Sequence, residues 1–436
     1  MSLHPLSKSV SIIGVGSTKY GNPFETPELA GLAFQEYGAW AVLAALDDAG
    51  VNPREVDHLV MGSIGSPTHN ALNVSPQHGF LEWVGMKGKS TNYQCAGCAS
   101  GFNAFNQAVD MIAGGRYDIV VCVDMELNNT IVHPDKPSHI RYSFGEYAEC
   151  YGFMPNLGVN GIDTGYNRWL GTTFIAQDTT GRHYMRENGI TRDELEDAAI
   201  GGSITGREHG ALGPDCFAKT PYSEIAKQYG FDSVTDYMKS DLNPYFSDLD
   251  RVNYCGIKVE GASALVLCAT DIAKRYQAKP IEVVNVSQCD LSTMIPNNQH
   301  RMTAGAIEQI YGVTGYTPED IDYMASTNMD QYDTLDSAEE AGYLPKGEGW
   351  KYFRDGETRF DKSKPMNTDG GAQGLGHAFA ASGIHHYAEM VLQMRGEAEG
   401  RQIEPAPKVS LMRGTGASHS VSCAILRVVE DEGSDE

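Results

Sequence analysis

Two segments of the chain place a reactive side chain at the start of a helical pattern. In the first, Cys98 lies between Gly97 and Gly101, and apolar residues at helical spacing follow from Phe102 to Ile112. The positive end of a helix dipole favours the thiolate form of a cysteine at a helix N-terminus, and the flanking glycines permit close approach of other backbone. We therefore predict that Cys98 is a nucleophile.

The second segment is a glycine-rich run, 370–376, that ends at His377. A neighbouring imidazole favours the thiolate and accepts its proton. We predict that His377 is the partner base of Cys98. His385 and His386 lie about two turns farther along the same predicted helix, so we do not expect them to share the site.

Cys95 is the only cysteine near Cys98 in the sequence. The two form a single C-x-x-C pair, whereas a structural zinc ion needs four ligands. We expect no metal site in this chain and no catalytic role for Cys95. The other cysteines are scattered, and several lie in apolar stretches, as is usual for reduced thiols in the cytoplasm.

Composition excludes several classes of protein. The net charge of −24 argues against binding to nucleic acid, which depends on Lys and Arg contacts to phosphates. The longest apolar stretch, 262–269, is far shorter than a membrane span, and the first residues carry no secretion signal. With 436 residues, the chain is long enough for two domains. We expect a cytoplasmic protein with neither nucleic acid nor a membrane as partner.

The elements around Cys98 follow the order of an α/β sheet. Strands are predicted at 10–16, 56–62 and 117–123, and helices over 29–49 and from 102 to a stop at Gly114 and Gly115. From about residue 126 to 254 the chain is rich in Tyr, Gly, Asp and Asn and has few strand patterns. Thr191 and Glu194 form a capping box that predicts a helix over 195–204 inside this insertion.

An internal repeat indicates that the α/β unit is duplicated. Residues 48–61 match residues 313–326, so that Gly50, Pro53 and Asp57 pair with Gly315, Pro318 and Asp322 at one offset. Later in each half a glycine-bracketed turn opens a helix. Pseudo-symmetry would bring the turn of Cys98 close to the turn of His377.

Five segments in this order resemble the signature loops of the thiolase superfamily. They are the nucleophile loop Cys98-Ala-Ser-Gly101, the loop-domain helix at 184–199, the return strand at 259–264, the Asn/Gly-Gly/Gly-His loop at 366–378, and the last glycine-rich loop at 412–416. The resemblance implies an α/β, duplicated thiolase fold of two βαβαβαββ halves in five αβαβα layers, with an inserted loop domain. It divides the chain into an N-terminal half (1–125 and 256–275), the insertion (126–255), a C-terminal half (276–429) and an acidic tail (430–436).

Two groups within the superfamily are the most similar. One is the sterol-carrier-protein-type thiolases. The other is thiolase-like subunits that act with a small OB-fold and zinc-ribbon protein, and Asn367-Thr-Asp-Gly-Gly371 and Gly376-His377-Ala378 are typical of that group. The resemblance implies a homodimeric core, paired through the sheet beside the nucleophile loop, and a possible OB-fold/zinc-ribbon partner.

The resemblance also implies further site residues. The backbone N–H groups of Cys98 and Gly414 would bind the oxyanion of a tetrahedral intermediate. The second cysteine of thiolases, which acts as acid and base in the carbon–carbon step, is missing, because its two known positions hold Met329 and Met412. Candidates to replace it are Asn328, His419 and Tyr332.

We predict an acyl-CoA C-acyltransferase that uses coenzyme A as a substrate and has no permanently bound cofactor. It would cleave a β-ketoacyl-CoA thiolytically, or run the reverse Claisen condensation, through an acyl-Cys98 intermediate. The alternatives are a retro-aldol lyase on a β-hydroxyacyl-CoA, a C-acyltransferase to an aromatic acceptor, and an inactive subunit that stabilises an active partner. The intact Cys98 and His377 pair counts against the lyase, which needs no acyl-cysteine.

Overall fold

The structure is a computed structural model of the 436-residue chain. It describes residues 3–23, 25–63, 76–126, 173–245, 248–256, 259–290, 299–327, 330–416 and 420–429. The acidic tail at 430–436 and most of the first third of the predicted insertion lie outside the described residues. Within the described part, no helix is both long and apolar enough to cross a lipid bilayer.

The described strands form one mixed sheet in the order β3-β2-β4-β5-β1-β6-β9-β8-β7. The strands are β1 (Val10–Ser17), β2 (His58–Gly62), β3 (Ser90–Gln94), β4 (Ile119–Glu126), β5 (Gly261–Ala269), β6 (Ile281–Asp290), β7 (Tyr323–Ser326), β8 (Val409–Gly416) and β9 (Ser420–Val428). Only the first residues of β1 pair with β6, from Val10 with Val283 to Ile12 with Ile281. The sheet therefore consists of two halves joined at one corner.

The two halves repeat the same pattern of strands. In the first half β2 and β4 are parallel and β5 returns antiparallel to β4 and to β1. In the second half β7 and β8 are parallel and β9 returns antiparallel to β8 and to β6. The counterpart of β3 is reduced to a single bridge between Met324 and Met366.

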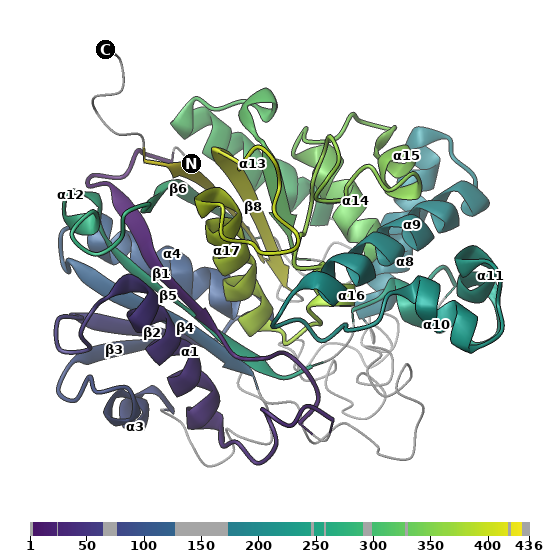
Figure 1. The fold of residues 1–436 in the computed structure, drawn as a ribbon. Coiled ribbons are helices and arrows are strands. Elements are labelled where there is room, and N and C mark those ends of the chain that lie inside the picture. The colour runs from purple at the N-terminus through teal and green to yellow at the C-terminus, as the bar shows by residue number, and fades with distance from the viewer. Residues whose placement is uncertain are drawn as a thin grey trace, which may run out of the picture.

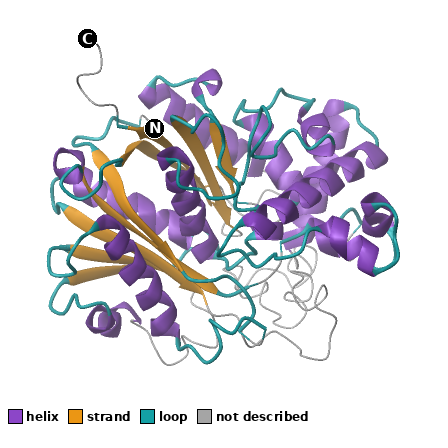
Figure 2. Cartoon of the chain, in the orientation of Figure 1, coloured by secondary structure: helices purple, strands orange, loops and turns teal. Residues whose placement is uncertain are grey.

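Helices cover both halves and fill the space between them (Figure 1). On the outer face of the first half lie α1 (Phe34–Ala49) and α3 (Pro76–Trp83), and on that of the second half α13 (Gln299–Thr314) and α14 (Gln331–Glu340). Between the halves lie α4 (Ser100–Ala113) and α17 (Ala380–Arg395), each packed against both. Figure 2 shows the resulting alternation of helical and strand layers. The duplicated five-layer arrangement is therefore the one that was predicted.

The sequence repeat has the same physical role in both halves. The carboxylate of Asp57 accepts hydrogen bonds from the backbone N–H groups of Asp118 and Ile119, where β4 begins. The carboxylate of Asp322 accepts them from Lys408 and Val409, where β8 begins. Gly50 and Gly315 both have a positive φ, of 64° and 75°, at the end of the preceding helix. The repeat is thus a helix stop followed by an aspartate that orders the neighbouring strand.

The predicted elements near the N-terminus differ in their limits from the observed ones. The first helix was predicted from residue 29 but begins at Phe34. Leu29 is buried and extends the apolar pattern, although the backbone around it forms turns. The hydrophobic pattern indicates which residues are buried, and here the buried residues extend beyond the N-terminal end of the helix.

The described part of the insertion is helical. It comprises α8 (Thr173–Asn188), α9 (Arg192–Leu212), α10 (Tyr222–Gln228) and α11 (Val234–Lys239). The predicted capping box is confirmed, because Thr191 Oγ1 accepts from Glu194 N and the Glu194 carboxylate accepts from Thr191 N. The helix that it opens runs eight residues past the predicted end at 204, to Leu212. The chain leaves the sheet after Glu126 and returns at Gly261, and the domain limits at 125/126 and 255/256 remain predictions.

Close backbone contact joins α9 to the glycine-rich loop before His377. A Cβ atom on Gly210 would lie 2.3 Å from Gly374 Cα, and one on Gly206 would lie 2.8 Å from the Gly370 carbonyl oxygen. No larger residue fits at either position of α9. The loop and the insertion therefore pack as one unit.

His209 stabilises the contact between α9 and the glycine-rich loop by hydrogen bonds at both of its ring nitrogens. Its Nδ1 lies 3.0 Å from the Asn367 carbonyl oxygen, and its Nε2 accepts from Phe360 N at 3.0 Å. This pattern requires the neutral ring with its proton on Nδ1. Burial lowers the pKa of His209 from 6.5 to about 4. His209 was not identified from the sequence, since nothing near it in the chain marks its partners.

We expect this histidine to make stability depend on pH. Below pH 6.5 His209 binds a proton in the unfolded chain. In the folded protein its ring stays neutral until the pH falls to about 4. Its contribution is therefore complete above neutrality and is lost as the pH falls from 6.5 towards 4. Between pH 8 and pH 5.5 it should account for a loss of about 1.4 kcal/mol in the free energy of unfolding.

The test is urea unfolding at these two pH values. His209→Gln should be less stable than the wild type at pH 8 and should lose about 1.4 kcal/mol less on moving to pH 5.5. His4→Gln, at an exposed position, is the matched control and should keep the wild-type difference. An unchanged pH difference in His209→Gln would show that the ring is not held neutral.

Candidate active site

Two corresponding turns open the central helices α4 and α17. At the first, Ala96 N donates to Ser100 Oγ at 2.8 Å, and at the second Ala378 N donates to Ser382 Oγ at 2.8 Å. In each turn, the backbone N–H of an alanine thus donates to the side chain of a serine four residues later. In this register Cys98-Ala-Ser-Gly101 corresponds to Ala380-Ala-Ser-Gly383. His377 is thus not the counterpart of Cys98 but of a residue three positions before it.

The two helices meet at a pair of glycines near these turns. A Cβ atom on Gly101 would lie 2.5 Å from the Ala380 carbonyl oxygen. A Cβ atom on Gly383 would lie 2.7 Å from the ring of Phe102. Because neither contact tolerates a side chain, the N-terminal ends of α4 and α17 lie close together.

Cys98 occupies the turn that leads into α4. Gly97 before it has a φ of 58°, a conformation that favours glycine. Cys98 is 5% exposed, whereas Cys95 is exposed to solvent. The positive end of the dipole of α4 favours a thiolate at the position of Cys98, and its role as the nucleophile stays a prediction.

His377 lies in the turn before α17 and is also buried. Its carbonyl oxygen accepts from Val259 N at 3.4 Å, and its ring packs edge-on against Phe379. Phe379 has a φ of 45°, a strained value for a residue with a side chain. Burial, with a smaller contribution from the neighbouring His386, lowers the pKa of His377 from 6.5 to about 3. The ring is therefore neutral at pH 7 and can accept a proton from a thiol.

Behind this turn, Asp369 joins His385 and His386. Asp369 Oδ2 lies 2.5 Å from His386 Nδ1 and 3.3 Å from His385 Nδ1, and all three residues are buried. Burial alone would raise the pKa of Asp369, but the two imidazoles outweigh it and hold the pKa well below its usual range. Asp369 Oδ1 also accepts from Gly371 N at 2.9 Å. Both histidines thus support the loop that carries His377, although they were not expected near the site.

The last glycine-rich loop passes the start of α4. A Cβ atom on Gly414 would lie 2.5 Å from the ring of Phe102, one turn inside the helix. A Cβ atom on Gly416 would lie 2.6 Å from Ala99 N and 3.2 Å from the carbonyl carbon of Cys98. Both glycines are required by these approaches, and Gly416, which was not singled out from the sequence, lies beside the Cys98 peptide. The oxyanion role of Gly414 stays a prediction.

Of the three candidates for the missing acid and base, only Tyr332 lies within the described residues. Asn328 and His419 lie outside the described residues, as does Met329. Tyr332 is buried and donates its hydroxyl hydrogen to the Leu249 carbonyl oxygen at 3.0 Å, which engages it in packing the insertion. Met412 is fully buried in the apolar core between the two halves of the sheet.

A buried acid lies beneath the nucleophile turn. Asp124, near the end of β4, is 0% exposed, and a Cβ atom on Gly62 or Gly101 would lie 2.2 or 3.2 Å from its Oδ2. Burial and the adjacent Glu126 raise the pKa of Asp124 well above its usual range. This shift favours the neutral, protonated form of the acid beneath the Cys98 turn. A polar residue at the end of an otherwise apolar strand was the available signal for it.

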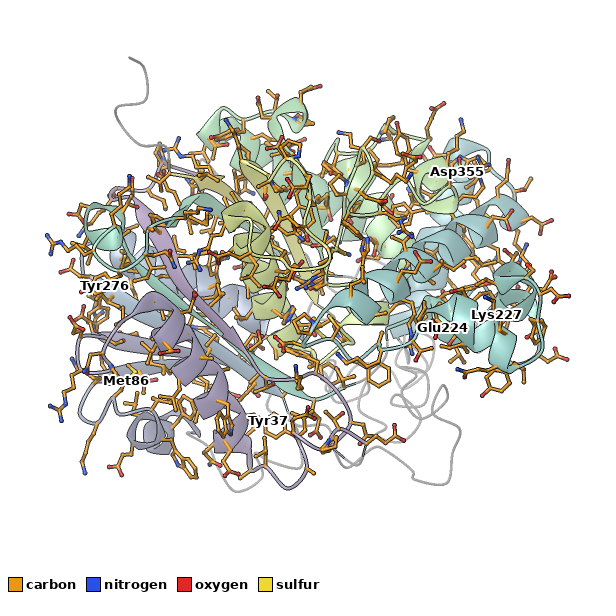
Figure 3. The ribbon with its side chains drawn as sticks, in the orientation of Figure 1. Tyr37, Met86, Glu224, Lys227, Tyr276 and Asp355 are labelled. Atoms are coloured by element: carbon orange, nitrogen blue, oxygen red, sulfur yellow. The ribbon has the colours of Figure 1, made fainter. Side chains whose placement is uncertain are left out.

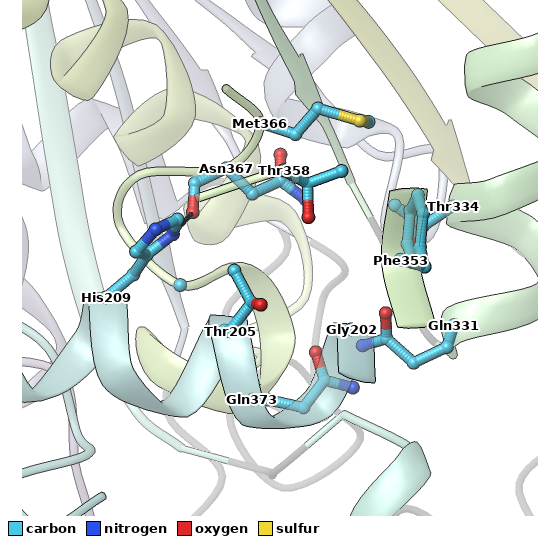
Figure 4. A pocket seen from close by; sticks show the side chains of 12 residues that line it. Gly202, Thr205, His209, Gln331, Thr334, Phe353, Thr358, Met366, Asn367 and Gln373 are labelled. Carbon is cyan, nitrogen blue, oxygen red and sulfur yellow. Dashed lines mark hydrogen bonds between the residues drawn. The ribbon is translucent and has the colours of Figure 1, made fainter. Parts of the chain in front are cut away.

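A small polar cavity lies between α9 and the loop at 366–373. Figure 4 shows side chains that line it, among them Thr205, His209, Gln331, Thr334, Phe353, Asn367 and Gln373. It is large enough for a water molecule but not for an acyl group. Neither Cys98 nor His377 lines it, so this cavity belongs to the packing of the insertion. Among the described residues, no three His, Cys, Asp or Glu side chains are grouped so that they could hold a metal ion.

Comparison with known proteins gives matches along nearly the whole chain. It is 27% identical to an acetyl-CoA acetyltransferase of Methanothermobacter thermautotrophicus, over 95% of this chain and 98% of that protein. It is 26% identical to the benzoylsuccinyl-CoA thiolase subunit BbsB of Thauera aromatica, over 94% of this chain and 95% of that one. It is 25% identical to sterol carrier protein 2 of Bos taurus, over 98% of this chain and 74% of that protein.

Solved structures share the fold. A structure titled Ltp2-ChsH2(DUF35) aldolase matches with a TM-score of 0.72 and 21% identity, over 97% of this chain and 98% of that one. Human mitochondrial 3-ketoacyl-CoA thiolase in complex with CoA matches with a TM-score of 0.66 and 18% identity, over 98% of this chain and all of that one. The predicted duplicated thiolase fold is therefore confirmed.

Two family models divide the chain between them. The model of the thiolase N-terminal domain matches residues 10–208, and the model described as thiolase C-terminal domain-like matches residues 287–427. Together they cover most of the chain and include the turns of Cys98 and His377. The chain therefore belongs to the thiolase superfamily.

Proposed function

We propose that this protein is a thiolase-type acyltransferase that moves an acyl group between Cys98 and coenzyme A. The observation that carries the proposal is the crossing of α4 and α17, which brings the turn of a buried cysteine close to the turn of a neutral, buried histidine. The names of several relatives, among them acetyl-CoA acetyltransferases from two methanogens, support the same class of reaction. A related fold has been solved with CoA bound.

In the cleavage direction, the first step forms a bond between Cys98 Sγ and the keto carbon of a β-ketoacyl-CoA. His377 accepts the thiol proton, and the imidazolium gains stability from the thiolate beside it. Backbone N–H groups of Cys98 and Gly414 stabilise the tetrahedral oxyanion. Collapse of the intermediate breaks the carbon–carbon bond, and the departing acyl-CoA carbanion takes up a proton. The thiol of a second CoA then attacks the acyl-cysteine, which releases a new acyl-CoA and frees Cys98.

The departing carbanion needs a proton donor. Met329 and Met412 cannot transfer a proton, and Tyr332 already donates to Leu249. Our candidates at this step remain His419, which can transfer a proton, and Asn328, whose amide can hydrogen-bond the enolate oxygen of the leaving acyl-CoA.

A retro-aldol lyase is the second candidate, and one structural neighbour is titled an aldolase. A lyase of that kind has no use for an acylated cysteine. The burial of both Cys98 and His377 at the helix crossing favours acyl transfer over the lyase. Covalent labelling of Cys98 by an acyl-CoA distinguishes the two.

We further propose that the active form contains a second polypeptide. BbsB is named as a subunit, and the solved neighbour Ltp2 is titled together with ChsH2(DUF35). From the sequence resemblance we expect a small OB-fold protein with a zinc ribbon. Its physical role would be to close the CoA channel and exclude water from the oxyanion site.

Cys98→Ser should abolish acyl transfer, because a serine hydroxyl is far less ionised than a thiol at this position. We expect a loss of about 1000-fold or more in the rate of CoA-dependent cleavage of a β-ketoacyl-CoA. Cys95→Ser is the matched control and should be nearly as active as the wild type. A Cys98→Ser rate above roughly a tenth of the wild type would reject the nucleophile assignment.

The chain should form at least a homodimer. Among the described strands, β3 lies at an edge of the sheet and leads directly into the Cys98 turn, and an edge strand can pair with a second copy. Light scattering at micromolar concentration should give at least twice the mass of the chain. A monomer under these conditions would contradict the proposal.

The isolated chain should be inactive or weakly active with a panel of β-ketoacyl-CoAs. Adding a small zinc protein encoded beside it should restore turnover. Full turnover by the purified, zinc-free chain alone would show that no partner is required.

A further inference from the structure

Arg207, on α9, differs from the other arginines inside the molecule. Its Nε donates to the Thr220 carbonyl oxygen at 2.9 Å. No carboxylate among the described residues pairs with it, although the chain carries a net charge of −24. The buried arginines Arg395, Arg401 and Arg413 each pair with an acid, namely Asp48, Glu389 and Asp333.

Two aromatic rings flank the guanidinium of Arg207. The centroids of the Phe217 and Tyr222 rings each lie 5.4 Å from its Cζ. Tyr222 is 2% exposed, and its hydroxyl has no hydrogen-bond partner within the described structure. Glu224 and Lys227 of the same helix, α10, are exposed at the surface, so the carboxylate of Glu224 supplies no counter-charge inside (Figure 3). The guanidinium of Arg207 and the hydroxyl of Tyr222, which has no acceptor among the described residues, thus lie among aromatic side chains.

This site is next to the reactive turn. Phe217 N donates to the Leu375 carbonyl oxygen at 3.2 Å, and Ala218 N to the Gly374 carbonyl oxygen at 2.8 Å. The segment that carries Phe217 therefore runs along the residues that immediately precede His377. Arg207 is partly exposed, whereas His377 is buried. A ligand that binds Arg207 from the surface would therefore lie beside the segment that contacts the residues before His377.

The free edge of the guanidinium is suited to an oxyanion. Arginine presents its terminal N–H groups in a planar fork that binds phosphate or carboxylate with two parallel hydrogen bonds. Burial lowers the pKa of Arg207, and a bound anion would offset that cost. The hydroxyl of Tyr222 offers a further donor beside it.

We propose that Arg207 binds a phosphate group of coenzyme A, with Tyr222 as a supporting residue. The inference rests on the proposed function and names the nucleotide end of its substrate. A carboxylate on the acyl group is the other source of an oxyanion. The phosphate fits better, because the acyl group must reach buried Cys98, while the nucleotide end of CoA stays towards the surface where Arg207 is partly exposed.

The experiment compares two acyl donors that differ in their phosphates. Single-turnover acylation of Cys98 is followed by mass spectrometry with acetyl-CoA and with S-acetyl-pantetheine, using the full chain together with its partner if one is required. Arg207→Gln should lower the acylation efficiency with acetyl-CoA by about 10- to 100-fold and leave that with S-acetyl-pantetheine unchanged. Tyr222→Phe should give a smaller loss that is likewise confined to acetyl-CoA.

A control variant, a ratio measured within each sample and a second substitution at Arg207 test whether the effect belongs to this site. Arg354→Gln removes an exposed arginine that pairs with its neighbour Asp355, and it should affect neither donor. The ratio between the donors is measured on the same sample, so a partly unfolded variant does not distort it. Arg207→Lys, which keeps the charge without the fork, should lose only several-fold with acetyl-CoA, and its ratio decides the question if Arg207→Gln fails to fold.

An equal loss with both donors would overturn the proposal, because Arg207 would then act on the acyl end or on the fold. No loss with either would overturn it as well. A wild-type protein that is acylated by neither donor would instead refute acyl transfer itself. Calorimetric titration with CoA then still tests this site, since Arg207→Gln should bind CoA about 10-fold more weakly or worse if the site is real.

Discussion

The close crossing of α4 and α17 is the constraint on which the rest of the structure depends. At Gly101 and Gly383 the two helices approach so closely that a single methyl group on either would collide with the other. Each helix follows the turn of one half of the duplicated fold, so the crossing is also a contact between the halves, in addition to the pairing of β1 with β6. A larger residue would separate the helix starts and, with them, the turns of Cys98 and His377. Asp57 and Asp322 occupy equivalent positions in the two halves, and each orders a strand on its side of this crossing.

Around the crossing, buried charge is satisfied away from the reactive groups. Arg401 binds Glu389 through two hydrogen bonds, and Glu389 also accepts from Thr368 Oγ1 at 2.6 Å. Asp369, next to Thr368, carries its charge against His385 and His386. This chain of buried polar contacts holds the loop from 367 to 377 in place while His377 itself remains neutral. A buried network of this kind is costly to disturb, because each broken pair leaves a charge without compensation.

The insertion shares an apolar cluster with the second half of the molecule, and small residues and one histidine attach it to the loop before His377. Gly206 and Gly210 allow α9 to lie directly on the glycine-rich loop, and His209 adds hydrogen bonds at both of its ring nitrogens. The loop that presents His377 is therefore contacted by the insertion on one side and by the central helices on the other. A ligand bound along α9 would act on the same loop, which links the proposed Arg207 site to the chemistry at Cys98.

The sequence alone determined those features whose signals are local. Helix caps such as Thr191 and Glu194, the repeated Gly, Pro and Asp pattern, and the order of the glycine-rich loops are each written within a few consecutive residues, and from them the duplicated α/β fold followed. The matching Ala-Ser-Gly stretches at 99–101 and 381–383 were also readable but were missed. Only the tertiary structure decided that His209 contacts Asn367, that Asp369 contacts both His385 and His386, and that Gly416 lies against the Cys98 peptide. It also decided that no acid among the described residues pairs with Arg207. These contacts join residues from distant parts of the chain. They depend on how the helices and loops pack, and no local pattern of residues records that.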